Sequence, residues 1–220
     1  MASGYEACYY TGVLGWVWGR VHAAMERRYR SLAGIGTVLE LGAGHGQHAH
    51  FVKHPFDRYV ASDLRAELVR IPEADPRFQV ASVDASDLSQ FGDGTIDRLV
   101  ATCLLVHLPD PYAALGEWRR VLTDGGHATI YVPCEPSWLN RTARSGFIWP
   151  RARRHGAEDP ELLAYQGHQV HYPAMRTFID RTFAGDDVSR TRYPVPGLPW
   201  NLSLFEIVHV RKIGPQSEGN

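Results

Sequence analysis

The spacing of hydrophobic positions changes twice along the chain. Residues 1–35 carry apolar side chains at helical spacing, and Gly34 and Gly36 close this segment. Residues 36–133 alternate short apolar runs, typical of buried strands, with stretches of helical period. Residues 134–220 begin with a stretch rich in Pro, Arg and Trp that has no clear period up to about Pro160. The pattern therefore predicts three zones, with a strand–helix repeat in the middle one.

Five strands are predicted in the middle zone. They cover residues 37–41, 58–62, 77–82, 96–102 and 127–132. Helices are predicted between and after them, over the stretch to about Lys53 and over residues 64–70, 111–122 and 171–183. Two final strands are predicted over residues 187–193 and 203–212. Such alternation is typical of an α/β fold, a parallel sheet with helices on both faces.

A glycine-rich loop follows the first predicted strand. Glycine stands at every second position, as Gly42, Gly44 and Gly46, and the acid Glu40 precedes the first of them by two residues. Glycine lets the backbone turn tightly and lets a ligand approach the amides, and the N-terminus of a following helix favours an anionic group. Nucleotide dehydrogenases also carry a glycine loop, but Gln47 stands where their third glycine would be.

An acidic residue follows each of the next two predicted strands. Asp63 follows the second strand and Asp84 follows the third. The carboxyl ends of parallel strands face one crevice, so we expect Asp63 to accept hydrogen bonds from a ribose diol and Asp84 to accept from an exocyclic amine of a purine. Each aspartate could instead cap a helix, and Glu40 could cap the loop or pair with an arginine.

Residues 37–132 resemble class I S-adenosylmethionine-dependent methyltransferases. ELGAGHG is similar to the family's E/D-x-G-x-G-x-G motif, and VDASDL is similar to its D-A-x-x-L motif. DGTIDRLVATCLLVHLPDP and LGEWRRVLTDGGHATIYVP are similar to its segments around strands four and five. The resemblance implies one Rossmann-like, doubly wound three-layer sandwich over residues 1–220. Its mixed sheet would have seven strands, with strand seven antiparallel.

The resemblance also implies S-adenosylmethionine as cofactor and S-adenosylhomocysteine as product. The residues expected to hold it are Glu40, Gly42, Ala43, Gly44 and Gly46 on the methionine and ribose side, Asp63 and Leu64 at the ribose, Asp84 and Ala85 at the adenine, and Thr102 and His107 near the sulfonium.

Two additions to the family's fold are expected to recognise the methyl acceptor. One is the N-terminal segment 1–35, where Tyr9, Tyr10 and His22 are candidate substrate-binding residues. The other is an insertion over residues 134–170, expected to act as a lid over the site, with the candidate His171 just after it. Trp16 and Trp18 in the N-terminal segment could serve either in the site or in the core.

Histidines are the candidate general bases. A hydroxyl acceptor benefits from a base, whereas an amine acceptor needs only its neutral form. We predict His168 as the base, with His107 as the second candidate, which could instead contact the cofactor or cap a helix. His168 and His171 lie in YQGHQVHY, which resembles a block of bacterial methyltransferases of cell-surface sugar and natural-product clusters, with Gly167 in place of the expected acid.

Composition excludes some partners. The 23 basic and 24 acidic residues give a formal net charge of −1, which favours neither a nucleic-acid nor a membrane partner. Three irregularly spaced cysteines, Cys8, Cys103 and Cys134, favour a reducing cytoplasm. Histidines crowd the predicted helix after the glycine loop and are expected to form a solvated face, without a metal; they are His45, His48, His50 and His54.

The combined hypothesis is methyl transfer from S-adenosylmethionine to an oxygen or nitrogen of a small metabolite. A sugar-containing or antibiotic-like natural product is the preferred acceptor. A nucleotide-cofactor oxidoreductase and a non-catalytic module that binds S-adenosylmethionine remain as alternatives. The sequence leaves the identity of the acceptor and the oligomeric state open.

Overall fold

The computed structural model describes residues 12–72 and 75–214. Within them, seven strands form one sheet in the order β3-β2-β1-β4-β5-β7-β6. The strands are β1 (Ile35–Leu41), β2 (Phe56–Asp63), β3 (Phe78–Ser82), β4 (Ile96–Thr102), β5 (Leu122–Pro133), β6 (Asp187–Tyr193) and β7 (Phe205–Arg211). Strands β1 to β5 pair in parallel, and β7 pairs antiparallel with both β5 and β6. The predicted α/β fold with an antiparallel strand seven is confirmed.

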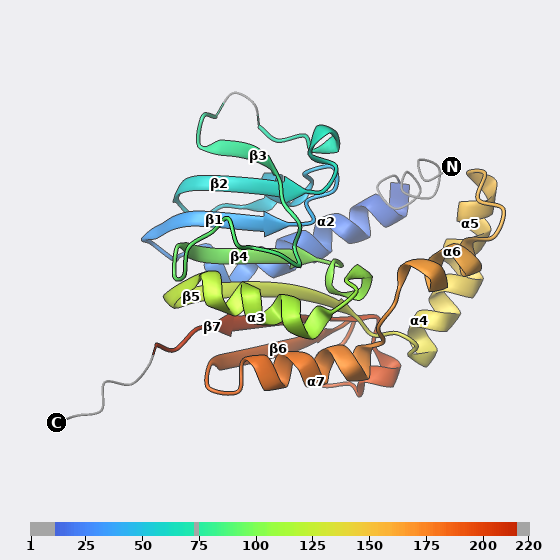
Figure 1. The fold of residues 1–220 in the computed structure, drawn as a ribbon. Helices are drawn as coiled ribbons and strands as arrows, with labels where there is room; N and C mark the ends of the chain where they lie inside the picture. The colour runs from blue at the N-terminus through green and yellow to red at the C-terminus, as the bar shows by residue number, and fades with distance from the viewer. Residues whose placement is uncertain (1–11, 73–74, 215–220) are drawn as a thin grey trace.

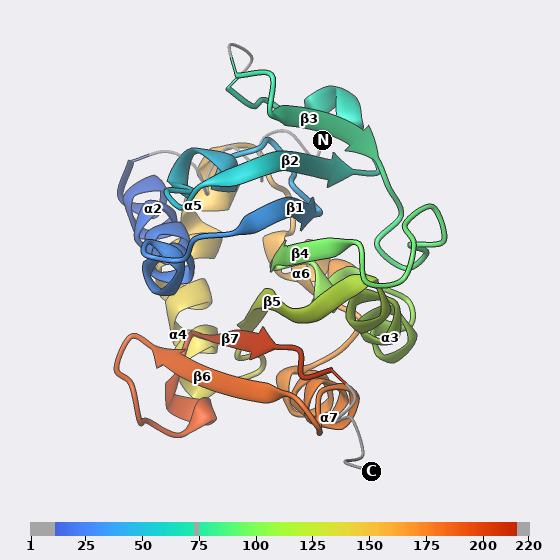
Figure 2. The same ribbon diagram turned by 90° about the vertical axis from the view of Figure 1, so that its left-hand side faces the viewer.

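Helices cover both faces of this sheet (Figure 1). They are α2 (Gly12–Glu26), α3 (Pro111–Val121), α4 (Trp138–Ala143), α5 (Trp149–Arg154), α6 (Pro160–Gly167) and α7 (Tyr172–Thr182). Short turns of 3₁₀ helix are η1 (Arg27–Tyr29), η2 (His48–Phe51), η3 (Ala66–Leu68), η4 (Leu105–His107) and η6 (Trp200–Leu202). Figure 2 shows α2 on one side of the sheet and α3 and α7 on the other. Helices α4, α5 and α6 stand beyond the carboxyl ends of the parallel strands (Figure 1).

Helix α3 shows how local sequence produces an element. Asp110 caps it by accepting a hydrogen bond from the Ala113 amide at 2.9 Å, and Pro111 occupies the first turn. Leu115 and Trp118 recur at i, i+3 spacing and are fully buried against the sheet. The Trp118 indole N–H donates to the Ala85 carbonyl at 2.8 Å, so this large side chain is buried with its polar atom satisfied.

Two hydrophobic clusters hold the layers together. The larger one lies under α3 and α7 and includes Leu99 and Ile130. The smaller one lies between the sheet and α2 and includes Met25, Val38 and Val100. Alternate positions of one strand, such as Leu99 and Val100, serve opposite clusters because successive strand side chains point to opposite faces.

Two predicted helices are wrong. The stretch to Lys53 forms only η2, and residues 64–70 form only η3. Pro55 and Pro72 follow shortly after and disfavour helix just before them, so each segment has room for little more than one turn. Leu64 is also largely exposed, so the second segment offers little apolar surface to dock on the sheet.

Two further expectations also need correction. The predicted solvated histidine face is wrong for His48 and His54, which are buried, and right for His50, which is exposed; His48 packs against Glu26 of α2 and His54 against Arg98 of β4. The stretch after Cys134, which shows no clear period, is helical: α4, a π-helical turn η5 (Arg144–Ile148) and α5 follow one another. Ser137 caps α4 by accepting a hydrogen bond from the Asn140 amide at 3.0 Å. Helices α4 and α5 and the turn η5 are each too short to show a hydrophobic period in the sequence.

Across residues 12–72 and 75–214, no helix combines the length and apolar character that crossing a bilayer requires.

Candidate active site

A cavity of about 740 Å³ lies at the carboxyl ends of the parallel strands. Its walls come from α2, the glycine loop, the ends of β2, β4 and β5, and the inserted helices. The cavity lining brings together these predicted site residues: His22, Gly42, Asp63, Thr102, His107 and His168. This volume is within the usual range for small-molecule sites.

The glycines of the loop serve different purposes. Gly42, Gly44 and Gly46 all have positive φ values, of 64°, 55° and 79°. A Cβ atom on Gly46 would stand 2.2 Å from the Arg70 carbonyl oxygen, so that glycine allows two backbone segments to meet. A Cβ atom on Gly44 would meet nothing within 4 Å. The loop therefore packs tightly at Gly46 and leaves open space beside Gly44.

Asp63 connects the end of β2 to the glycine loop. Its carboxylate accepts hydrogen bonds from the Gly44 amide at 3.0 Å and from the Arg65 amide at 2.9 Å. A carboxylate has about four lone-pair sites, so two protein donors leave capacity for a ligand hydroxyl. Asp63 thus shapes the loop and can still accept hydrogen bonds from a ligand in the cavity that it lines.

Glu40 lies beneath the loop, outside the cavity lining. Glu40 is only 2% exposed, and its carboxylate accepts a hydrogen bond from the Tyr59 hydroxyl at 2.7 Å. Burial raises the pKa of Glu40. The structure therefore places Glu40 as a support for the strand that carries the loop, and its predicted contact with the cofactor stays a prediction.

The other predicted cofactor residues are divided between the surface and the core. Asp84 is exposed and accepts from the Ser86 amide at 2.8 Å, as in a local turn. Ala85 is buried, and Leu64 is exposed. Ala43 is buried within the loop. None of these four side chains belongs to the cavity lining, and their roles stay predictions.

The end of β4 contributes Thr102 and Cys103 to the cavity. Cys103 has a φ of 54°, which a residue with a Cβ atom seldom adopts. Burial raises the pKa of the Cys103 thiol to about 12, so the group stays protonated and is a poor nucleophile at neutral pH.

His168 forms a hydrogen-bonded pair with Glu135. The His168 Nδ1–H donates to Glu135 Oε2 at 2.6 Å, and Arg144 forms an ion pair with the same carboxylate. Burial alone would raise the pKa of Glu135, but the His168 hydrogen bond and the Arg144 charge hold it below its usual range. With Nδ1 used in this way, Nε2 is the nitrogen of His168 left for a ligand, which is the arrangement that a general base requires.

His107 lies beside His168, with ring centroids 4.9 Å apart. Its Nδ1–H donates to the Gly167 carbonyl at 2.7 Å. Burial lowers the pKa of His107, which keeps the ring neutral at neutral pH. Gly167, which stands where the sequence block would have an acid, thus holds His107 through its backbone.

Sequence reasoning missed Glu135, Arg144 and the inserted-helix residue Phe147, all of which line the cavity. Glu135 follows β5 by two residues. The rule that drew attention to Asp63, an acid at the carboxyl end of a parallel strand, would also have found Glu135.

The remaining candidates lie elsewhere. His171 is exposed at the N-cap of α7, outside the cavity lining, whereas Tyr9 and Tyr10 lie outside the described residues. Trp16 is 66% exposed, so core packing is excluded for it, whereas Trp18 lines the cavity. Within residues 12–72 and 75–214, no group of three or more His, Cys, Asp or Glu side chains could hold a metal ion.

Comparisons with known proteins agree with this geometry. Residues 39–130 match the family model described as a methyltransferase domain. Methyltransferase AacuQ from Aspergillus aculeatus is 33% identical over 95 residues, which cover 42% of this chain and 30% of that protein. The chain thus spans about a third of the length of this curated relative.

Solved structures share the fold at low sequence identity. The CurJ carbon methyltransferase is 16% identical with a TM-score of 0.59, covering 88% of this chain and 54% of that one. N-methyltransferase NodS from Bradyrhizobium japonicum, solved with S-adenosylhomocysteine, is 15% identical with a TM-score of 0.58, covering 88% and 86%.

Together, the sheet topology and the glycine loop at its carboxyl edge define a Rossmann-like α/β domain. Residues 39–130 match a methyltransferase domain, and the sheet has the fold of solved methyltransferases.

Proposed function

We propose that the protein transfers a methyl group from S-adenosylmethionine to a small metabolite, and that the methylated atom is the oxygen of a hydroxyl group. The sequence left oxygen and nitrogen open. The observation that carries the choice is the His168–Glu135 pair, with its 2.6 Å hydrogen bond, in the same cavity as Gly42 and Asp63. A hydroxyl needs a base for this reaction, and a neutral amine does not.

The residues of the chain fit the cofactor. The open space beside Gly44 can admit a ligand close to the loop backbone, and Asp63 has free lone pairs for ribose hydroxyls. Thr102 borders the same cavity at the end of β4. When bound, the cofactor supplies an electrophilic methyl group on a sulfonium.

In this proposal, His168 removes the proton of the acceptor hydroxyl with Nε2 as the oxygen gains its methyl group. The proton stays on the imidazole until it is released to solvent. Glu135 holds the ring through Nδ1 and stabilises the imidazolium, as carboxylates do beside catalytic histidines. Arg144 keeps Glu135 ionised in its buried position, because an opposite charge nearby favours the charged form.

We propose that the inserted helices exclude water from the cavity. Phe147 and Ile148 of η5 line the cavity opposite the strand ends, and both belong to the insertion 134–170 predicted to be a lid. A closed apolar wall strengthens every electrostatic interaction inside the site and protects the methyl donor from water.

The acceptor class is narrowed by weaker arguments. The net charge of −1 offers no general attraction for nucleic acid or for a membrane surface. We also place the protein in the cytoplasm, because its three irregularly spaced cysteines favour a reducing compartment. The YQGHQVHY block supports a sugar-containing natural product, of the kind that antibiotic biosynthesis provides. Tyr9, Tyr10 and His171 stay candidates for contacts with this acceptor.

The proposal is tested with methyl-labelled S-adenosylmethionine and matched pairs of small glycosides, one bearing a hydroxyl and the other an amine at the same carbon. We expect label in the hydroxyl compounds. His168→Gln should lower kcat on them by about 10²- to 10⁴-fold, the usual contribution of a general base. The variant His155→Gln, at an exposed histidine just after α5 that has no proposed role, serves as the control.

Three results would contradict the proposal. Turnover of hydroxyl compounds by His168→Gln at the wild-type rate would exclude the base. Bound S-adenosylhomocysteine without labelled product from any compound would favour a non-catalytic binding module, whereas binding of a nicotinamide nucleotide would favour an oxidoreductase.

A further inference from the structure

A second chain of buried polar side chains reaches the cavity from the α2 side. Arg98 on β4 donates to Glu26 on α2, with Nη1 2.9 Å from Oε2 and a second contact from Nη2 to Oε1. His48 Nε2 lies 2.8 Å from Glu26 Oε1, and His22 Nδ1 lies 3.0 Å from His48 Nδ1. All four residues are at most 5% exposed. We call this series the α2 relay.

The α2 relay determines which ring nitrogens carry protons. Burial would raise the pKa of Glu26, but the Arg98 charge and the His48 hydrogen bond lower it to about 2, so its carboxylate only accepts. His48 therefore donates through Nε2, and when its ring is neutral its Nδ1 accepts from the His22 Nδ1–H. The Nε2 atom of His22 then carries a lone pair.

His22 is the member of the α2 relay that lines the cavity. No residue in the described part of the chain hydrogen-bonds its Nε2. Burial lowers the pKa of His22 to about 3, so the ring stays uncharged at neutral pH. His22 therefore offers the cavity a neutral hydrogen-bond acceptor.

The buried polar groups of the α2 relay contribute little to the folding stability of the protein. Desolvating Glu26 and Arg98 offsets much of their attraction, and apolar side chains of similar size would pack α2 at least as well in many proteins. The buried Arg98 Nε atom also has no hydrogen-bond partner. A costly network that reaches the cavity at His22 is better explained by what His22 binds.

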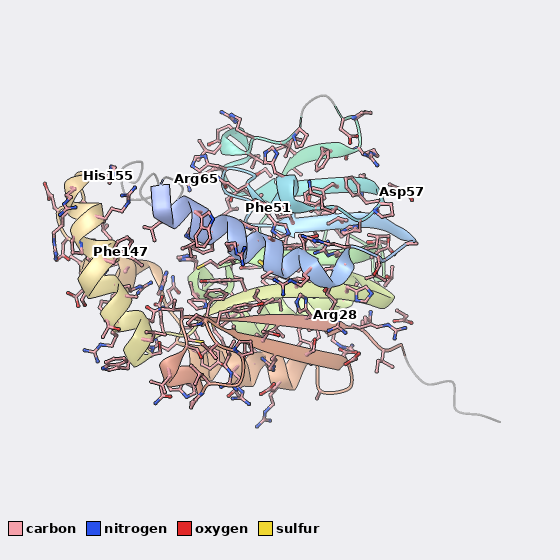
Figure 3. All side chains as sticks on the ribbon, turned by 180° about the vertical axis from the view of Figure 1, so that it is seen from behind. Arg28, Phe51, Asp57, Arg65, Phe147 and His155 are labelled. Atoms are coloured by element: carbon pink, nitrogen blue, oxygen red, sulfur yellow. The ribbon has the colours of Figure 1, made fainter. Side chains whose placement is uncertain are left out.

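The position of His22 indicates which part of the cofactor lies beside it. Turn η2 begins two residues after Gly46, and its Phe51 ring stacks on His22 with centroids 5.3 Å apart. Figure 3 shows Phe51 beside α2, on the face of the sheet that this helix covers. His22 thus stands next to the glycine loop, on the side expected to hold the methionine part of the cofactor.

We propose that His22 Nε2 accepts a hydrogen bond from the α-ammonium group of the cofactor's methionine moiety. Glu26, Arg98 and His48 are positioning residues that act through His22. An ammonium group only donates, so it matches a neutral imidazole lone pair and would be repelled by a protonated ring. The assignment moves His22 from methyl-acceptor recognition to cofactor recognition. It goes beyond the proposed function because it holds whatever acceptor is methylated.

The test compares three ligands by calorimetric titration. S-adenosylhomocysteine carries both the ammonium and the carboxylate, decarboxylated S-adenosylmethionine keeps only the ammonium, and 5′-methylthioadenosine has neither. We expect His22→Phe, which keeps a ring of similar size, to weaken the first two about tenfold to a hundredfold, as loss of a hydrogen bond to a charged group predicts. Binding of 5′-methylthioadenosine should not change, which also reports an intact fold.

Unchanged affinity for S-adenosylhomocysteine would overturn the proposal, as would equal weakening of all three ligands. Neither measurement depends on turnover, so a failed base assignment and a failed ammonium site remain distinguishable.

The positioning role is tested at His48. A glutamine there can still accept from His22 and donate to Glu26, whereas a leucine can do neither. We expect ¹⁵N NMR of the ring nitrogens to show His22 protonated on Nδ1 and bare on Nε2 in the wild-type protein and in His48→Gln. His48→Leu should lose this preference and bind S-adenosylhomocysteine more weakly. A wild-type His22 protonated on Nε2 would refute the α2 relay.

Discussion

The His168–Glu135 pair makes Glu135→Gln the most informative substitution. Glutamine keeps the shape of Glu135, which is 5% exposed, but removes the charge that faces His168 Nδ1 at 2.6 Å. The imidazolium that forms as His168 takes the proton then loses a charge-assisted hydrogen bond, worth roughly 1.5–3 kcal/mol. That loss lowers kcat by roughly 10- to 150-fold. Arg144, 11% exposed at its side chain, also loses its anionic partner.

The assay is initial-rate transfer of labelled methyl to a hydroxyl acceptor across a pH series. The KM for the methyl acceptor and the affinity for S-adenosylhomocysteine should change little. The matched control is Glu158→Gln, an exposed acid of the same insertion.

Wild-type kcat across the pH series in Glu135→Gln would refute the reasoning that Glu135 acts through His168. A collapse of S-adenosylhomocysteine affinity would also refute it, because the carboxylate would then be holding the cofactor site together.

Four further predictions follow from single contacts. Gly46→Ala should abolish binding of S-adenosylhomocysteine and lower the Tm, because its Cβ would stand 2.2 Å from the Arg70 carbonyl oxygen; wild-type affinity would show that the loop can shift. Asp63→Asn should weaken the same ligand tenfold or more by calorimetry, since one amide oxygen cannot replace a carboxylate that accepts from two amides. Trp118→Ala should cost about 3–5 kcal/mol in urea unfolding, and a smaller change would mean that the cluster under α3 closes around the gap. Burial and nearby arginine charges lower the pKa of His209 from 6.5 to about 4, so the unfolded chain takes a proton first and stability should fall as the pH drops between these values. His209→Gln should flatten that slope in urea titrations, and the exposed control His50→Gln should leave it unchanged.

The elements that sequence predicted well are those with a strong local signal. Strand β4 was predicted with its bounds, because the apolar run Leu99–Ala101 follows shortly after the Asp93-Gly94 turn. Helix α3 was predicted to within a residue, because Asp110 and Pro111 mark its start and the buried stripe has one period. The glycine loop and Asp63 at the cavity were predicted because a parallel sheet brings successive strand ends to one edge.

The polar partnerships could not be predicted from local sequence. Glu135 and His168 are 33 positions apart, and Glu26 and Arg98 are 72 apart. His48 and His54 were predicted to be solvated, because nothing in their own segment shows that they will pack against Glu26 and Arg98. Sequence determined the hydrophobic period of each segment and the edge of the sheet at which the candidate site residues lie. Tertiary structure decided which charged and imidazole groups face one another, because a buried charge selects its partner by position in space and not by distance along the chain.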